Sequence, residues 1–288
     1  MCRTSALSLV SSRLRVVSLG KCPACGVEVA SEDFYCHQCG KPLRLCPNCG
    51  FQLPREVAVQ ARYCPSCGQP LQRLIPGLKA TLIVWLLSLL LSAALGATLT
   101  ENLLLATVLS EAALAVPPLL YLLRQGTLVR SLSFPRRPSI MDFLFGLIVS
   151  PASFAVDAAV NYPVALAFPP PQEYLDAMES LAPRSILDLA TWFVVILVFV
   201  GPCEEFLSRW FVQRGLERRF SRRTGLVFAS ALFGLAHLSP WSSIGVTAAG
   251  LLIGYVYQRR SYNLWAPIGV HVGHDWLAFA VLFISPRG

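Results

Sequence analysis

The amino-acid sequence predicts an all-α polytopic membrane bundle of about seven or eight transmembrane helices, preceded by two small β-hairpin modules rich in cysteine. Three observations lead to this prediction. The mean hydropathy of the 288 residues is +0.56, and only 14% of them are charged, which is too apolar for an ordinary soluble domain. The cysteines are concentrated before residue 79, where long apolar runs begin.

Composition divides the chain into segments that need separate interpretation. Arg13 and Arg15 interrupt the first apolar stretch, which therefore lacks the unbroken hydrophobic core of a signal peptide. We expect five parts: a flexible lead-in (1–20), two cysteine-rich modules (21–41 and 42–69), a linker (70–78) and a membrane domain (79–285).

The cysteine-rich modules contain four copies of a Cys-x-x-Cys-Gly pattern. Two residues between the cysteines let one turn present both thiolates to a tetrahedral ion, and the glycine accepts the backbone conformation that closes the turn. The pattern predicts two structural Zn²⁺ ions, each held by four thiolates with no position open for catalysis. The predicted ligands are Cys22, Cys25, Cys36 and Cys39 for one ion and Cys46, Cys49, Cys64 and Cys67 for the other.

Two alternatives accompany this zinc prediction. The four pairs could be interleaved between the two ions, or the cysteines could form a disulfide framework, although all four pairs share the spacing typical of zinc sites. The modules hold few apolar residues, so metal binding would supply the missing folding energy. They resemble the double zinc ribbons at the front of bacterial and archaeal membrane proteins, a resemblance that implies docking or sensing through an unidentified protein partner.

The membrane domain contains seven apolar segments, and about 20 apolar residues are needed to cross the hydrocarbon. An eighth helix could be concealed in the third segment, which contains Pro151 and Pro163. The predicted spans are 80–98, 102–123, 140–164, 185–208, 224–238, 241–258 and 263–284, of which the fifth and sixth are short.

Charge placement predicts the orientation of these spans in the lipid bilayer. Arginines cluster in the 124–139 loop, in the 209–223 segment and at Arg259–Arg260, whereas the 165–184 loop is acidic. Basic loops face the cytoplasm, so we expect a multi-pass membrane protein with its zinc ribbons in that reducing compartment. This placement also accounts for the net charge of +8 and disfavours nucleic-acid binding.

Three groups of ionisable residues lie within or at the ends of apolar spans, where each charge costs about 2.5–3.5 kcal/mol. Side chains four apart share a helical face, so Glu205 can pair with Arg209 while Glu204 turns toward a cavity. The helical rise places the three groups at similar depths, which predicts one water-filled cavity open to the cytoplasm. The groups are Glu204-Glu205 with Arg209, Phe233 with His237, and His271 with His274 and Asp275.

The order Glu-Glu-x-x-x-Arg, Phe-x-x-x-His and His-x-x-x-Asp over residues 140–285 resembles the CPBP family of intramembrane endopeptidases. That family includes the type 2 CAAX prenyl endopeptidases and the Abi proteins. The resemblance implies a hydrolase, a glutamic or metal-dependent protease acting on peptide or protein substrates at the membrane. It further implies that Glu204 activates water with help from His237, that His271 and Asp275 stabilise the oxyanion, and that Glu205 and Arg209 support them.

Asp275 departs from the family pattern, which often has asparagine at this position. An amide donates to an oxyanion whereas an ionised carboxylate repels it, so Asp275 must be protonated, orient His271 or bind a metal. Glu204, His237, His271 and Asp275 would also make a plausible catalytic metal site with one position open for water. We favour the mechanism without a metal.

Less specific interpretations apply to the remaining polar residues. His274 is read as a contact between helices and as the substitute if His271 is misassigned. Glu111 and Asp157 are expected to pair with each other or with Asn161, and Cys203 to pack as a small residue. Two other functions compete with proteolysis: a non-catalytic adaptor or immunity protein whose ribbons recruit a partner, and a transporter with a proton relay, although no internal repeat is visible.

Overall fold

The computed structural model describes residues 18–22, 25–30, 36, 38, 75–98, 102–125 and 139–285. The chain forms two compact units, Met1–Gln72 and Arg73–Gly288. The second cysteine-rich module, 42–69, and its four predicted ligands lie outside the described residues, as does Cys39.

The first unit contains a small antiparallel hairpin. Strand β1 (Ser18–Lys21) pairs with β2 (Glu28–Ala30), with Lys21 opposite Glu28. Between the strands, the Gly26 N–H donates to the Cys22 carbonyl at 2.8 Å, and Gly26 has φ 74°, a conformation that favours glycine. The predicted role of glycine in closing the first cysteine turn is therefore confirmed.

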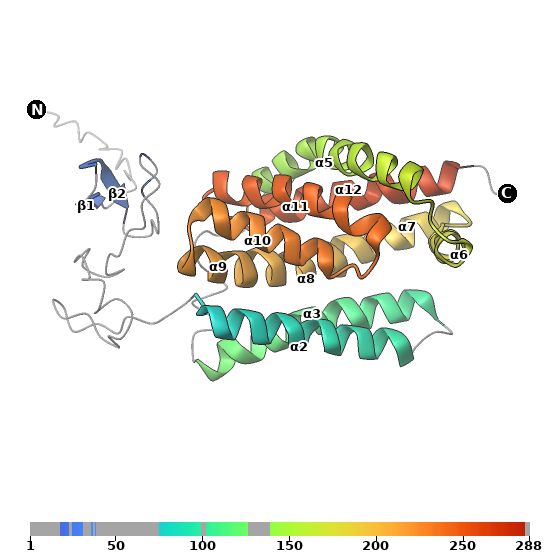
Figure 1. Ribbon diagram of the computed structural model, residues 1–288, viewed down its shortest axis with the longest axis horizontal. Helices are drawn as coiled ribbons and strands as arrows, with labels where there is room; N and C mark the ends of the chain where they lie inside the picture. The colour runs from blue at the N-terminus through green and yellow to red at the C-terminus, as the bar shows by residue number, and fades with distance from the viewer. Residues whose placement is uncertain are drawn as a thin grey trace, which may run out of the picture. The chain divides into compact units, whose positions relative to one another are not determined.

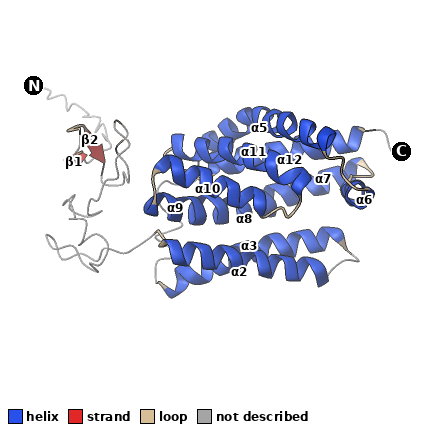
Figure 2. Cartoon of the chain, in the orientation of Figure 1, coloured by secondary structure: helices blue, strands red, loops and turns tan. Residues whose placement is uncertain are grey.

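The second unit is a helical bundle (Figures 1 and 2). Its helices follow the predicted spans closely, except that the fourth is longer. In chain order they are α2 (Leu78–Thr98), α3 (Leu103–Arg124), α5 (Ile140–Ala167), α6 (Gln172–Leu181), α7 (Ile186–Val195), η1 (Ile196–Val200), α8 (Gly201–Glu205), η2 (Phe206–Gln213), α9 (Arg214–Arg219), α10 (Arg222–Leu235), α11 (Pro240–Arg259) and α12 (Trp265–Ile284).

Helix starts are set by polar caps and the interiors tolerate proline. Asn102 and Ser139 accept hydrogen bonds from backbone N–H groups three residues later, at 2.9 and 3.2 Å.

Helix α5 continues through Pro151 and Pro163 as one helix, so the suggestion of an additional helix there was wrong. Proline is tolerated in membrane helices because neighbouring groups satisfy the freed backbone. The extra helix of this unit is instead the short α6, in the acidic 165–184 loop.

The fourth span runs without a loop from Ile186 to Arg219, which makes 34 residues. The prediction ended it at residue 208, because the polar residues that follow resembled the end of a span. These residues are buried inside the unit instead. Two π-helical stretches, η1 and η2, flank the short α8 that carries the acidic pair. Such π turns are frequent at functional sites.

Among the residues that the structure describes, five helices are long and apolar enough to cross a membrane: α2, α3, α5, the 186–219 segment and α12. The predicted fifth span corresponds to α10, which has only 14 residues. Large apolar side chains such as Leu86, Leu90 and Ile148 face outward, while Glu205 and Arg209 are fully buried. Exposed apolar side chains around buried charged ones are the reverse of the usual distribution in a soluble protein, and they match a surface in contact with lipid. The chain is an integral membrane protein with an all-α membrane domain.

Glycines allow the helices near the polar residues to pack closely. Helices α5 and α12 pack side by side (Figure 1). At their contact, a Cβ added to Gly146 would collide with the backbone of Ala266 and Val270. A Cβ on Gly201 would meet the side chain of Val272, so α8 also approaches α12 closely. Helices α2 and α3 pack against each other, and α3 packs on α8. These contacts position the residues of the candidate site.

Candidate active site

The two carboxylates of the acidic pair on α8, Glu204 and Glu205, lie in different surroundings. The Glu205 Oε2 atom accepts a hydrogen bond from Arg209 Nε at 2.9 Å, and both side chains are 0% exposed. The ion pair predicted from the four-residue spacing is therefore confirmed. Glu204, one position earlier, keeps 15% of its side chain exposed and lines a pocket.

His271 on α12 lies among three carboxylates. Its Nδ1 atom is 2.8 Å from Glu205 Oε1. Its Nε2 atom is 3.4 Å from Asp275 Oδ2 and 4.0 Å from Glu204 Oε2. An ionised carboxylate only accepts hydrogen bonds, so Nδ1–H of His271 donates to Glu205 and Nε2 is the nitrogen that faces Glu204.

His237 follows the end of α10 in a turn where Leu238 has φ 51°. Its Nδ1–H donates to the Phe233 carbonyl at 3.0 Å, which leaves Nε2 as the acceptor of the neutral ring. The Phe233 ring packs edge-on against both imidazoles, at centroid distances of 5.3 Å to His237 and 5.8 Å to His271. The Arg209 guanidinium carbon lies 4.9 Å from the centroid of the same ring. Phe233 therefore connects the two histidines.

A pocket of about 170 Å³ lies between the α2–α3 pair and the end of α10. It is large enough for several water molecules. Glu204 and His237 both line it. His271 adjoins this pocket through its contact with Glu204. The full lining is Trp85, Leu89, Ser92, Glu111, Leu114, Glu204, Leu207, Ser208, Phe233, Ala236 and His237.

Glu111 on α3 is the residue whose position the sequence predicted incorrectly. Asp157 accepts a hydrogen bond from Asn161 Nδ2 at 3.0 Å, so that pair is confirmed. Glu111 does not join it but lines the pocket with Glu204. The signal in the sequence was that Glu111 is the only acidic residue of an otherwise apolar helix.

His274 contacts a neighbouring helix, as predicted. Its Nδ1 atom is 3.1 Å from Ser153 Oγ, and its Nε2 atom is 3.9 Å from Asp157 Oδ2. Both partners are on α5, so His274 connects α12 to α5 on a different side from the His271 contacts. The structure thus assigns separate surroundings to the two histidines of α12.

After the acidic pair in the chain, buried polar residues continue at four-residue spacing along one face of the 186–219 segment. Gln213 Nε2 donates to Glu217 Oε1 at 2.8 Å and to the Gly254 carbonyl of α11 at 3.2 Å. Gln258 Nε2 also donates to Glu217 Oε1, at 2.6 Å. A Cβ on Gly254 would collide with Gln213 and approach Arg209. Sequence analysis missed this buried row, although its spacing was visible.

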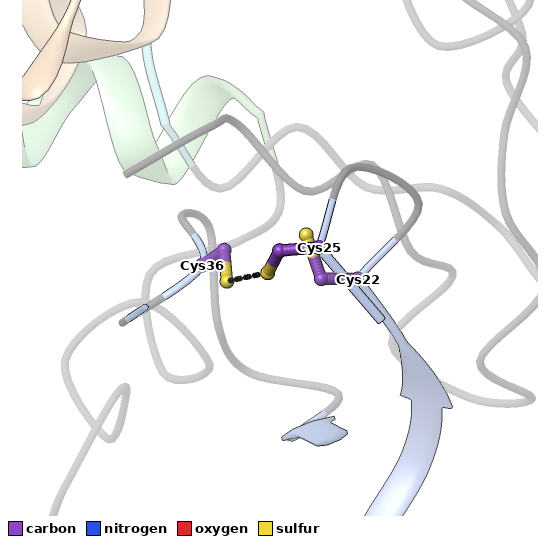
Figure 3. A group of neighbouring side chains, drawn as sticks. All are labelled: Cys22, Cys25 and Cys36. Carbon is purple, nitrogen blue, oxygen red and sulfur yellow. Dashed lines mark hydrogen bonds between the residues drawn. The ribbon is translucent and has the colours of Figure 1, made fainter. Parts of the chain in front are cut away.

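In the first zinc ribbon, Cys22, Cys25 and Cys36 point their sulfur atoms toward one another (Figure 3), all within 4.8 Å. The Sγ atoms of Cys25 and Cys36 are 3.4 Å apart, far beyond the disulfide bond length of about 2.05 Å. Two thiolates on one tetrahedral zinc ion lie about 3.8 Å apart, from Zn–S bonds near 2.3 Å. The three cysteines therefore fit a structural zinc ion.

The predicted site residues of the membrane domain do not bring their ligand atoms as close together as the three ribbon cysteines do. Across the described ranges, the cysteine trio is the only group of three or more potential ligands whose ligand atoms all lie within 4.8 Å. Glu204, His237, His271 and Asp275 are near one another without forming such a group.

The fold and the site define a membrane-embedded helical domain that holds carboxylates and imidazoles around a small pocket, joined to a zinc-binding module. Residues 186–277 match the family model described as type II CAAX prenyl endopeptidase Rce1-like, and residues 22–68 match that of the double zinc ribbon. These two matches confirm both resemblances inferred from the motifs. All six predicted site residues of the membrane domain lie within the first match, and their roles stay predictions. No curated protein and no solved structure matches the chain.

Proposed function

We propose that this protein is an intramembrane endopeptidase that hydrolyses peptide bonds of membrane-associated substrates. The observation that carries the proposal is the position of Glu204, which lines the pocket 4.0 Å from His271 Nε2. On the other side of the ring, His271 Nδ1 contacts Glu205, which is itself paired with Arg209. The match of residues 186–277 to a family model of prenyl endopeptidases supports the same activity.

In the proposed reaction, Glu204 is the general base that removes a proton from a water molecule in the pocket. His237 helps to hold this water, because the bond from its Nδ1–H to the Phe233 carbonyl leaves Nε2 to accept a hydrogen bond. The resulting hydroxide attacks the substrate carbonyl and generates an oxyanion. A His271 ring with hydrogen on both nitrogens donates from Nδ1 to Glu205 and from Nε2 to this oxyanion.

Glu205, Arg209 and Asp275 act as positioning residues in this proposal. Glu205 fixes the orientation of His271 through Nδ1, much as carboxylates orient histidines in metal sites. Of the three roles open to Asp275, its distance of 3.4 Å from His271 Nε2 favours orientation of the ring, with Asp275 in contact with Nε2–H until the oxyanion forms and accepts that hydrogen bond.

We propose that the reaction uses no catalytic metal. The ligand atoms of Glu204, His237, His271 and Asp275 do not gather into a group of three within 4.8 Å, whereas those of the ribbon cysteines do. Zn²⁺ binding normally requires three protein ligands at about 2.0–2.2 Å from one ion.

We further propose that the zinc ribbons lie on the cytoplasmic side and bind a protein partner. The basic ends of the helices support this orientation, because Arg214, Arg218 and Arg219 all lie at the end of the 186–219 segment. Four-thiolate sites need a reducing compartment, which the cytoplasm provides.

The test is cleavage by the full chain reconstituted in liposomes, with a farnesylated CAAX peptide and a mixture of membrane-anchored peptides as substrates and mass spectrometry of the products. Glu204→Gln should abolish cleavage while the variant still folds. Glu173→Gln is the matched control, since Glu173 is exposed on α6. Cleavage by the Glu204→Gln variant at the native rate would refute the proposal, and partner recruitment without any cleavage would favour an adaptor.

A further inference from the structure

Glu111 lies in the middle of α3, eight residues after its first residue. A carboxyl group at this depth is costly to bury and usually has a function or a partner. Its Oε2 atom is buried and has no hydrogen-bond partner in the part of the chain that the structure describes. The side chain lines the pocket beside Glu204.

A purely structural role does not account for this position. The neighbouring Ser110 hydroxyl donates to the backbone carbonyl of Ala106 and not to Glu111. Asp157 is already occupied by Asn161 and lies near His274. Burying a carboxylate oxygen without a hydrogen bond costs about 1–3 kcal/mol or more. If Glu111 served only to pair two helices, both of its oxygens should be hydrogen-bonded, and within the described residues Oε2 is not. The Glu111 side chain instead lines the pocket in which we place the substrate.

We propose that Glu111 is the general acid that protonates the leaving amine, a role that rests on the proposed peptidase function. Two carboxyl groups in one small pocket are most stable with a single proton between them, since two like charges repel strongly where water is scarce. Glu111 and Glu204 are the two carboxyl groups that line this pocket. With Glu204 ionised as the base, the shared proton resides on Glu111.

The proton balance of this step is complete without another reactant. Water gives one proton to Glu204 as its oxygen bonds to the substrate carbonyl carbon. The carbon–nitrogen bond then breaks, and the departing amine takes the proton of Glu111. The products are a carboxylic acid and an amine. Transfer of the proton from Glu204 to Glu111 restores the starting state.

The other polar groups of the pocket are less suited to this task. The Nδ1–H groups of His271 and His237 are committed to Glu205 and to the Phe233 carbonyl, respectively. The Nε2–H of His271 is committed to the oxyanion in the proposed reaction. Ser92 and Ser208 carry hydroxyls that are weak acids near neutral pH. Glu111 is also contributed by α3, outside the 186–277 stretch that matches the endopeptidase model. The pocket therefore draws an acidic group from a part of the chain that the family match does not cover.

The test compares two substrates of the same sequence, one with a scissile amide and one with a p-nitrophenyl ester whose leaving group needs no protonation. Glu111→Gln should lower kcat for the amide by about 10²–10⁴-fold, the usual contribution of a general acid, with KM nearly unchanged. The same variant should cleave the ester at close to the native rate. Glu111→Asp should recover part of the amide activity, and Glu173→Gln should behave as the native protein.

The pH profile provides a second readout that a structural role would not change. Native kcat for the amide should fall at alkaline pH as Glu111 loses its proton. In Glu111→Gln this fall should disappear, apart from any alkaline fall that His271 causes and that the ester shows as well. Equal losses on amide and ester with an unchanged profile, or native amide cleavage, would overturn the role of Glu111. If Glu204→Gln retains full activity on both substrates, it is the proposed function that fails.

Discussion

The Nδ1 atom of His271 lies 2.8 Å from Oε1 of Glu205, whose other oxygen accepts a hydrogen bond from Arg209. One fully buried carboxylate therefore holds both an imidazole from α12 and the guanidinium of η2. This connection determines that Nε2 of His271, and not Nδ1, faces Glu204. Several expected outcomes derive from it and from the packing around it.

Glu205→Gln should reduce both stability and activity. The substitution leaves the buried Arg209 without its charge partner, and breaking a buried ion pair costs about 3–5 kcal/mol. Thermal unfolding in detergent measures the loss. In the double variant Glu205→Gln/Arg209→Met, stability should recover in part while cleavage does not, because His271 still lacks its orienting carboxylate. Recovery of both would contradict the orienting role.

Asp275→Asn should keep activity within a few-fold of native, since an amide also contacts His271 Nε2 and can donate to the oxyanion. Asp275→Ala should lose about 10–100-fold in kcat, the usual cost of removing a partner that orients a histidine. Steady-state kinetics on one peptide compares the two variants. Equal, large losses in both would show instead that the negative charge of Asp275 is required.

Gly146→Ala should destabilise the bundle by about 1–3 kcal/mol, because the added methyl group meets the backbone of α12 and the crossing helices must separate. Gly77→Ala is the matched control, since a Cβ at Gly77 meets no atom within 4 Å. Thermal unfolding of the two variants in the same detergent makes the comparison. Equal melting temperatures would show that α5 and α12 are packed less closely than described.

Metal analysis of the purified chain should find two zinc ions per molecule. The variant Cys22→Ser/Cys25→Ser should hold one, because two of the ligands of the first ribbon are removed. Cys203→Ser, a substitution in α8 outside the ribbons, should still hold two. A third metal ion lost on Glu204→Gln would contradict the mechanism without a catalytic metal.

The orientation predicts different accessibility for the two sides of the membrane. An epitope inserted in the 168–171 segment before α6 should be cut by protease added to sealed cells that express the chain, with the protease free to reach their membrane from outside. An epitope placed before Ser18 should be cut only after the membrane is opened. The reverse pattern would place the zinc ribbons outside the cell.

Local spacing predicted much of this protein. The apolar segments indicated every membrane helix within a few residues at most ends, and the four-residue spacing of Glu205 and Arg209 predicted their ion pair. Both depend on interactions within one helix. The end of the fourth span was missed because Gln213 and Glu217 are polar, and only contacts with α11 explain their burial.

Long-range contacts were not predictable in the same way. His271 and Glu205 are 66 residues apart, and their contact depends on the close approach of α8 and α12 at Gly201. Glu111 was assigned to the wrong partner because its direction depends on how α3 packs on α8. The π turns around α8 also carry no recognised sequence signature.

The π-helical η2 has a consequence for changes in chain length. A π turn contains more residues than an α turn, so loss of one residue from Phe206–Gln213 would let an ordinary α-helix form there. The residues beyond the deletion would then rotate by much less than the about 100° that a deletion from a regular α-helix causes. Glu217 would keep its place beside Gln258 of α11. A one-residue deletion in this stretch should therefore be tolerated better than one in α11, which is a regular α-helix.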